Sequence, residues 1–163
     1  MSTSQDVLDV APSLRTPVDV RVVAHDDPLA GAEAVSIPVT TNGDVPAVLG
    51  VDRDGLRRAG FSPSVGQALA FPGSGVPVLV AVGVGELAAL DAASVRDAAA
   101  AFAAAVPFDG HLATRVPASP RVSLAEAAAA IVEGVLLARY RFSLRSTDTG
   151  PARVATLTLV ARG

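Results

Sequence analysis

Hydrophobic residues alternate with polar ones near both ends of the chain. Val18, Val20 and Val22 alternate with charged residues, and residues 153–161 (RVATLTLVA) repeat the same period of two. This period is typical of a β-strand with one buried face, because successive side chains point to opposite sides of a sheet. Shorter apolar or β-branched runs predict further strands at residues 34–39, 67–71, 76–84 and 111–116. The run 76–84 is apolar on both faces, which indicates a strand covered from both sides.

The hydrophobic period becomes helical in two long segments. Asp91 or Ser94 can cap the first, which is predicted to extend to about residue 105. Ser123 and Glu126 match the S-x-x-E capping box, in which each side chain accepts from the backbone N–H of the other residue. The second helix is therefore predicted over 123–140.

A shorter helix is predicted over residues 46–59. Pro46 suits a first helical turn and Gly60 suits the position after the last one, although Gly50 and Gly55 interrupt the segment. The predicted order is then β-β-α-β-β-α-β-α-β, and strands that alternate with helices are typical of an α/β fold. We expect a mixed β-sheet flanked by helices on both faces.

The length and the two ends complete the expected organisation. A chain of 163 residues fits one domain. Residues 1–15 are polar and lack periodicity, so we expect a flexible leader there and a single α/β domain over 16–163.

The composition excludes several classes of function. The 13 basic residues are all arginine and face 16 acidic ones, so the net charge of −3 offers no basic surface for nucleic acid. The chain has no cysteine, which excludes disulfides and thiol chemistry and fits a cytoplasmic location. It has no lysine, which excludes a lysine base or a Schiff base. No apolar stretch approaches the roughly 18 residues of a membrane span, so no membrane partner is expected.

Gly83 and Gly85 lie between an apolar strand and a predicted helix. Glycines at such a place can let the backbone approach a phosphate at a helix N-terminus. The same two residues also fit an ordinary strand-to-helix turn, and the sequence leaves both interpretations open.

Few residues suggest catalysis or metal binding. His25, Asp26 and Asp27, together with Glu33, can be drawn as an oxygen-rich metal site, but Asp-Asp-Pro is ordinary turn chemistry. His111 is an isolated histidine at a predicted strand start. No residue of this sequence is therefore predicted to be catalytic and none to bind a metal.

Residues 139–142 (RYRF) alternate cations with aromatic rings at the end of the last helix. Such a cluster can stack a base or a peptide. It also fits a structural role, in which Arg139 complements the helix dipole while Tyr140 and Phe142 bury against the sheet. Gly134, inside the same helix, indicates close packing of the helix on the sheet.

The same region carries a family resemblance. Glu133, Gly134, Leu137, Tyr140 and Phe142 follow the pattern E-G-x-x-L-x-x-Y-x-F. This pattern resembles the helix end in the amino-terminal domain of the leucyl aminopeptidase (cytosol aminopeptidase, peptidase M17) family. The strand end at residues 82–85 (VGVG) resembles that family's V-G-L-G turn.

The resemblance implies a macro-domain-like, three-layer α/β module that is not catalytic itself. It implies that the chemistry and two divalent metals, manganese or zinc, lie in a separate carboxy-terminal domain that this sequence does not contain. The implied partners are that catalytic domain and like subunits of a hexamer, and the implied role is assembly and access to the active site. Two alternatives stay open, a macro-like module that binds a nucleotide or ADP-ribose, and a free-standing non-catalytic relic.

Overall fold

The computed structural model describes residues 19–23, 31–73, 77–140 and 152–161. The predicted leader lies outside these residues. The helical elements are the 3₁₀ turns η2 (Ala47–Leu49) and η3 (Leu87–Ala89) and the α-helices α2 (Arg53–Arg58), α3 (Ala92–Ala105) and α4 (Leu124–Arg139). The strands are β1 (Asp19–Val23), β2 (Ala34–Thr40), β3 (Ala68–Phe71), β4 (Val78–Gly85), β5 (His111–Arg115) and β6 (Thr156–Val160). The predicted order of strands and long helices is confirmed.

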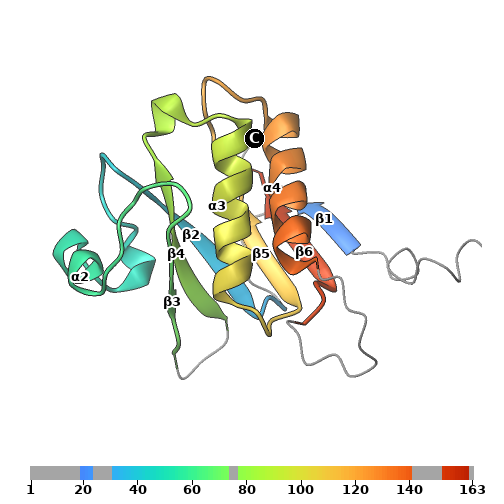
Figure 1. The fold of residues 1–163 in the computed structure, drawn as a ribbon, viewed down its shortest axis with the longest axis horizontal. Coiled ribbons are helices and arrows are strands. Elements are labelled where there is room, and N and C mark those ends of the chain that lie inside the picture. The colour runs from blue at the N-terminus through green and yellow to red at the C-terminus, as the bar shows by residue number, and fades with distance from the viewer. Residues whose placement is uncertain (1–18, 24–30, 74–76, 141–151, 162–163) are drawn as a thin grey trace, which may run out of the picture.

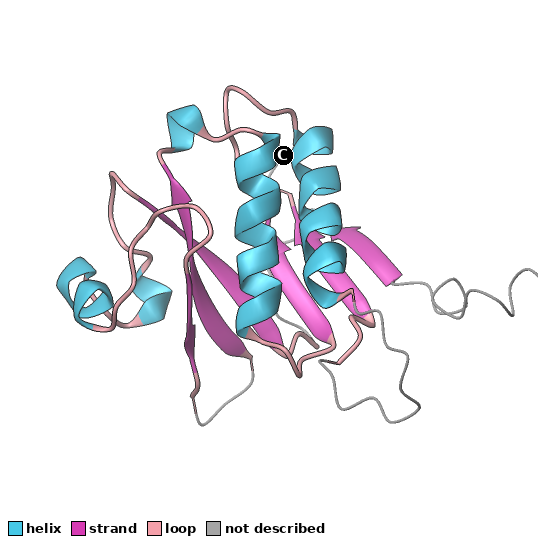
Figure 2. Cartoon of the chain, in the orientation of Figure 1, coloured by secondary structure: helices cyan, strands magenta, loops and turns pink. Residues whose placement is uncertain are grey.

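The six strands form one mixed sheet in the order β1-β6-β5-β2-β4-β3. Every neighbouring pair is parallel except β3 and β4, which are antiparallel. Helix α3 connects β4 to β5 and helix α4 connects β5 to β6, and the two helices lie side by side on one face of the sheet (Figures 1 and 2). Because both connect parallel strands, both begin at the carboxyl edge of the sheet and end at its amino edge.

A large hydrophobic core lies between the sheet and these two helices. The inward side chains of β4 and β6 meet a stripe of α3 that the helical period predicted, and all of its members are buried: Val95, Ala98, Ala99 and Phe102. Phe102 is 1% exposed, and burial of such a ring contributes about 1.5–3 kcal/mol to the free energy of unfolding. This face of the sheet is the principal site of stabilisation.

The opposite face of the sheet carries a smaller core. Val35, Ile37 and Val39 of β2 pack there against Leu49, Leu56 and Phe61 from the segment between β2 and β3. Ala81 of β4 belongs to this second core while its neighbours Val80 and Val82 belong to the first. Strand β4 is therefore covered on both faces, as its apolar run predicted, and the short segment with η2 and α2 supplies the second layer of helices.

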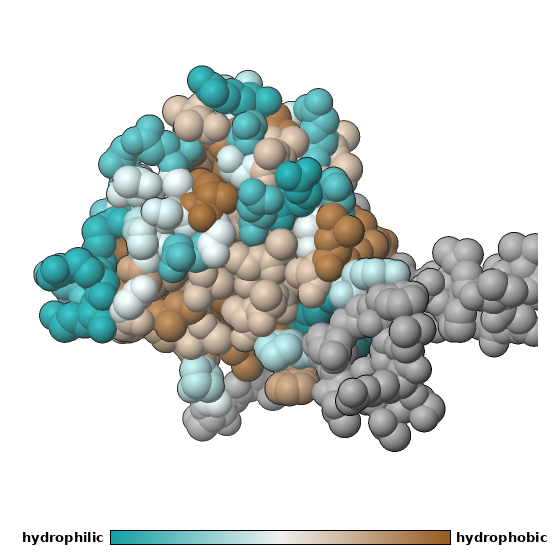
Figure 3. All heavy atoms as spheres, viewed as in Figure 1, coloured by the Kyte–Doolittle hydropathy of each residue, from teal (hydrophilic) through white to brown (hydrophobic). Residues whose placement is uncertain are grey.

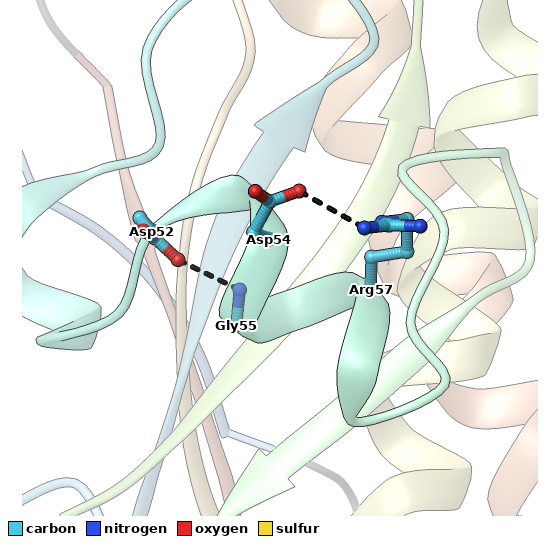
Figure 4. Close-up of polar contacts among 4 residues, drawn as sticks. All are labelled: Asp52, Asp54, Gly55 and Arg57. Carbon is cyan, nitrogen blue, oxygen red and sulfur yellow. Dashed lines mark hydrogen bonds and ion pairs between the residues drawn. The ribbon is translucent and has the colours of Figure 1, made fainter.

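The predicted helix over 46–59 is wrong as a continuous element. Gly50 has a positive φ of 66°, a left-handed conformation that ends η2 after one turn. Asp52 then caps α2, because its carboxylate accepts from the N–H of Gly55 at 2.7 Å (Figure 4). A glycine that can leave the helical region thus divides the segment into two short pieces.

Both long helices begin where capping residues predicted. Asp91 caps α3 by accepting from the N–H of Ser94 at 2.8 Å, which decides between the two candidates. Ser123 and Glu126 form the complete capping box of α4, with Glu126 accepting from the Ser123 N–H at 2.9 Å. The caps fix where α3 and α4 begin, and the parallel strands that they connect set the two helices parallel to each other.

Gly134 lies at a close approach of α3 and α4. A Cβ at this position would lie 2.2 Å from the carbonyl oxygen of Arg96 in α3. The expected close packing on the sheet is therefore corrected to close packing of one helix on the other. Glu133 lies beside the same contact, with a carboxylate oxygen 3.9 Å from a guanidinium nitrogen of Arg96.

We predict that Gly134→Ala destabilises the protein by about 1–2 kcal/mol, because the added methyl group overlaps backbone that cannot move aside easily. Helix propensity alone would give the opposite sign, a gain of about 1 kcal/mol. Urea unfolding followed by circular dichroism measures the difference. Ala104→Gly, at an exposed position of α3, is the control that measures the effect of helix propensity alone in this protein. A Gly134→Ala variant more stable than the wild type would contradict the close contact between the helices.

Candidate functional site

Gly83 and Gly85 end β4, where the sequence left open a phosphate-binding turn. The N–H of Gly83 donates to the carbonyl of Gln67 at 2.9 Å, and the N–H of Gly85 donates to the carbonyl of Pro63 at 2.8 Å. A Cβ at Gly83 would lie 2.1 Å from the carbonyl oxygen of Ser64. Gly83 therefore makes room for another stretch of backbone, and neither of these two N–H groups is open to a phosphate.

A cavity between the sheet and helices α3 and α4 is too small for a nucleotide. Its volume is about 30 Å³, and Ser36, Thr114 and Arg115 supply its polar lining. The hydroxyls of Ser36 and Thr114 are buried and hydrogen-bond to each other. A space of this size holds about one water molecule. The geometry thus favours the ordinary strand-to-helix turn at Gly83 and Gly85.

Glu33 has a structural partner at the start of β5. Its carboxylate accepts from the N–H of Gly110 at 2.6 Å and from the N–H of His111 at 3.1 Å. The hydrogen bond from His111 and then that from Gly110 hold the pKa of Glu33 below its usual range. The carboxylate thereby fixes the amino end of β5 beside the start of β2.

The metal site drawn from His25, Asp26, Asp27 and Glu33 cannot be assembled here, because the first three lie outside the described residues. Within the part of the chain that the structure describes, no three His, Asp or Glu side chains gather as metal ligands do. The residues described thus do not fit a metal centre, and no hydrolytic step through a metal is assigned to them.

Arg139, the last residue of α4, is buried to 9% exposure and points into the protein. Its guanidinium donates to carbonyl oxygens at the end of α3 and in the loop after it, and to one just before β6. The acceptors are Ala103 at 2.9 Å, Pro107 at 2.7 Å, Asp109 at 3.3 Å, Ala152 at 2.8 Å, and Val106.

The positive charge of Arg139 does not act at the end of its own helix, as the sequence suggested. Burial lowers the pKa of the guanidinium, and the nearby Asp109 carboxylate acts in the opposite direction. An arginine nevertheless stays charged in a protein. Its positive charge therefore complements the carboxyl end of α3, where helix carbonyls lack partners, instead of the end of α4.

The expected burial of Tyr140 is wrong. Tyr140 is 63% exposed and Leu137 is 61% exposed, whereas Val135 is fully buried. Because Val135 and Arg139 take the inward positions four residues apart, the positions two and five residues after Val135 turn outward. Phe142 lies outside the described residues, so its predicted burial stays untested.

The structure places four of the five residues whose pattern resembles the family. Gly134 brings α4 against α3, Glu133 lies beside Arg96, and Leu137 and Tyr140 face outward. The family model of the cytosol aminopeptidase family, N-terminal domain, matches residues 50–147, which is more than half of the 163 residues. The chain belongs to this family.

Solved structures agree with this cytosol aminopeptidase N-terminal domain. The bottromycin maturation enzyme BotP in complex with Mn is 31% identical, with a TM-score of 0.62 over 80% of this chain and 27% of that one. A second BotP structure is 29% identical, with a TM-score of 0.61 over 82% and 28%. A lysine-to-glutamate mutant of tomato leucine aminopeptidase is 18% identical, with a TM-score of 0.65 over 91% and 33%, and shows the shared fold.

The chain spans a third or less of the length of these structures. A comparison with curated protein sequences gave no match. Among the residues that the structure describes, none of the helices is both long and apolar enough to cross a membrane.

The surface of this N-terminal domain carries exposed apolar side chains at the amino edge of the sheet. We define the α4 patch as Leu136 and Leu137 near the end of α4 and Tyr140, which follows its last residue. Leu136 is 38% exposed. Hydrophobic residues also gather beside α4 on the side of β1 (Figure 3). Exposed apolar groups that cluster are typical of interaction surfaces.

We predict that Arg139→Met lowers the free energy of unfolding by about 3 kcal/mol, because several carbonyls lose a charged donor at once. Arg139→Lys should lose nearly as much, since an ammonium group cannot reproduce the planar fork. Denaturant unfolding measures both. The exposed Arg58→Met is the control and should change stability by less than about 0.5 kcal/mol. Wild-type stability in Arg139→Lys would contradict the need for a planar guanidinium.

We predict that the stability advantage of the wild type over Glu33→Gln depends on pH. Because folding lowers the pKa of Glu33, its contribution is complete above its unfolded value, roughly 4.3, and is lost as pH falls through the lower folded value. Urea unfolding of the wild type and Glu33→Gln at several pH values from acid to neutral measures this difference in the free energy of unfolding. The exposed Glu86→Gln is the control; a difference that grows toward acid would contradict the hydrogen bonds to Gly110 and His111.

Proposed function

We propose that this chain acts as the non-catalytic N-terminal domain of a metal-dependent leucyl aminopeptidase, in assembly and in access to the active site. The observation that carries the proposal is the family match over residues 50–147. Release of N-terminal residues from peptides, the two metals and the hexamer belong to the whole enzyme in this proposal. Its location would be the cytoplasm, which the cysteine-free sequence supports.

The α4 patch supports the assembly role. Its members are exposed aromatic and aliphatic side chains at a helix end that Arg139 joins to α3 by hydrogen bonds. Interfaces take much of their affinity from a few such side chains when a partner desolvates them. The catalytic domain is the partner we assign to this surface.

The observations give less support to the alternative of a nucleotide or ADP-ribose module. The N–H groups of Gly83 and Gly85 are engaged by backbone carbonyls, and the adjoining cavity has a volume of about 30 Å³. No specific contact favours that function.

We predict that the purified chain alone does not hydrolyse a leucine anilide with added manganese or zinc. Mixed with a separately produced leucine aminopeptidase catalytic domain, it should form a heavier complex and change the rate of hydrolysis. Light scattering after gel filtration and the absorbance of the released aniline measure the two effects. Activity that stays with this chain through purification would overturn the non-catalytic role.

Leu137→Asp tests the surface. We expect it to weaken the complex roughly tenfold or more, because an interfacial charge must be desolvated. Val48→Asp is a matched control, since Val48 is 56% exposed in η2 and lies on the other face of the sheet. Equal loss in both variants, or loss in neither, would contradict the assignment of the α4 patch.

A further inference from the structure

A pocket with an apolar floor and a cationic rim lies at the carboxyl end of β2, beside α2. Its volume is about 270 Å³. Val39, Leu56 and Phe61 form the floor and are 1%, 2% and 5% exposed, while Arg53 and Arg57 lie at the rim. The volume lies just below the roughly 300 Å³ at which pockets for drug-sized ligands begin, which indicates a ligand with few heavy atoms.

Arg53 is held in place by the chain around it. Its Nη2 donates to the carbonyl oxygen of Thr40, the last residue of β2, at 3.2 Å and to that of Gly43, in the loop that follows, at 2.6 Å. A guanidinium carries five N–H groups, so Nε and Nη1 keep three that no described residue of the chain takes. The side chain is therefore positioned before any ligand arrives.

Arg57 lies one turn further along α2, on the same side as Arg53, because residues four apart on a helix are neighbours. Its Nη2 is 3.3 Å from a carboxylate oxygen of Asp54, and Figure 4 shows the two side chains facing each other above α2. The pair is exposed, at 77% and 67%, so it is weak and exchangeable. A ligand carboxylate can replace Asp54 at little cost.

We propose that this pocket binds a small free carboxylate that carries an apolar group, of about the size of an N-acylated leucine. The apolar group would lie against Val39, Leu56 and Phe61, which are already nearly buried, and would remove its own hydrocarbon surface from water. The carboxylate would accept from Arg53 and Arg57, and arginine pairs with carboxylates through parallel hydrogen bonds. An inorganic anion can bind only the arginines of the rim, and an apolar amide can pack only on the apolar floor. Neither therefore matches both parts of the pocket.

The test is a titration of the full chain with N-acetyl-L-leucine, followed by amide NMR shifts. We expect saturable binding with a Kd on the order of millimolar, as suits a ligand of this size. N-acetyl-L-leucine amide, which lacks only the charge, should bind at least about tenfold more weakly, as should inorganic phosphate. The site is independent of the proposed assembly role, since the titration needs no catalytic domain.

Arginine variants locate the site. Arg57→Gln, at an exposed position that leaves folding intact, should weaken binding about fivefold or more, and Arg53→Gln should do the same. Arg58→Gln makes the same charge change in the same helix but does not line the pocket, so it should retain the wild-type Kd. The proposal is overturned if no saturable shift is seen up to about 50 mM acid, if acid and amide bind equally, or if Arg58→Gln weakens binding as much as Arg57→Gln.

Discussion

The charged fork of Arg139 joins three parts of the structure that are distant in sequence. It leaves the end of α4 and binds the carbonyls that close α3, those of the loop before β5, and that of Ala152 before β6. Both helices connect parallel strands, and the strands that follow them, β5 and β6, are neighbours, so fixing the helix ends against each other also fixes where β5 and β6 enter the sheet. Gly134 makes this possible, since only a residue without a side chain lets α4 come close enough to α3.

Local chemistry made much of this fold predictable. The helix starts at Asp91 and Ser123 depend on hydrogen bonds within one turn, and the strand periods depend on neighbouring side chains, so both are encoded in short windows of sequence. The division of the segment 46–59 was not predicted, because it depends on a backbone conformation that Gly50 permits without requiring it.

Long-range contacts explain what the sequence did not reveal. An arginine at a helix end fits its own dipole equally well, and only the parallel arrangement of α3 and α4 directs Arg139 toward the carbonyls of α3. The sequence predicts a buried Tyr140 because aromatic rings are often buried, yet the inward position of Arg139 leaves Tyr140 exposed. The pocket at Arg53 could not be predicted from the sequence for a similar reason, because its floor combines side chains from β2, from α2 and from Phe61 after α2.

The topology also separates the two surfaces to which we assign partners. The α4 patch lies where α4 ends, at the amino edge of the sheet, whereas the pocket at Arg53 lies where β2 ends, at the carboxyl edge. The Gly83 and Gly85 turn lies at the carboxyl edge, beside the end of β2, and is filled by backbone from the Pro63 loop, which closes the place where many α/β folds hold a nucleotide. The same loop extends from Phe61, so the segment that closes that turn also shapes the neighbouring pocket. A ligand in the pocket can therefore contact the loop directly without reaching the α4 patch.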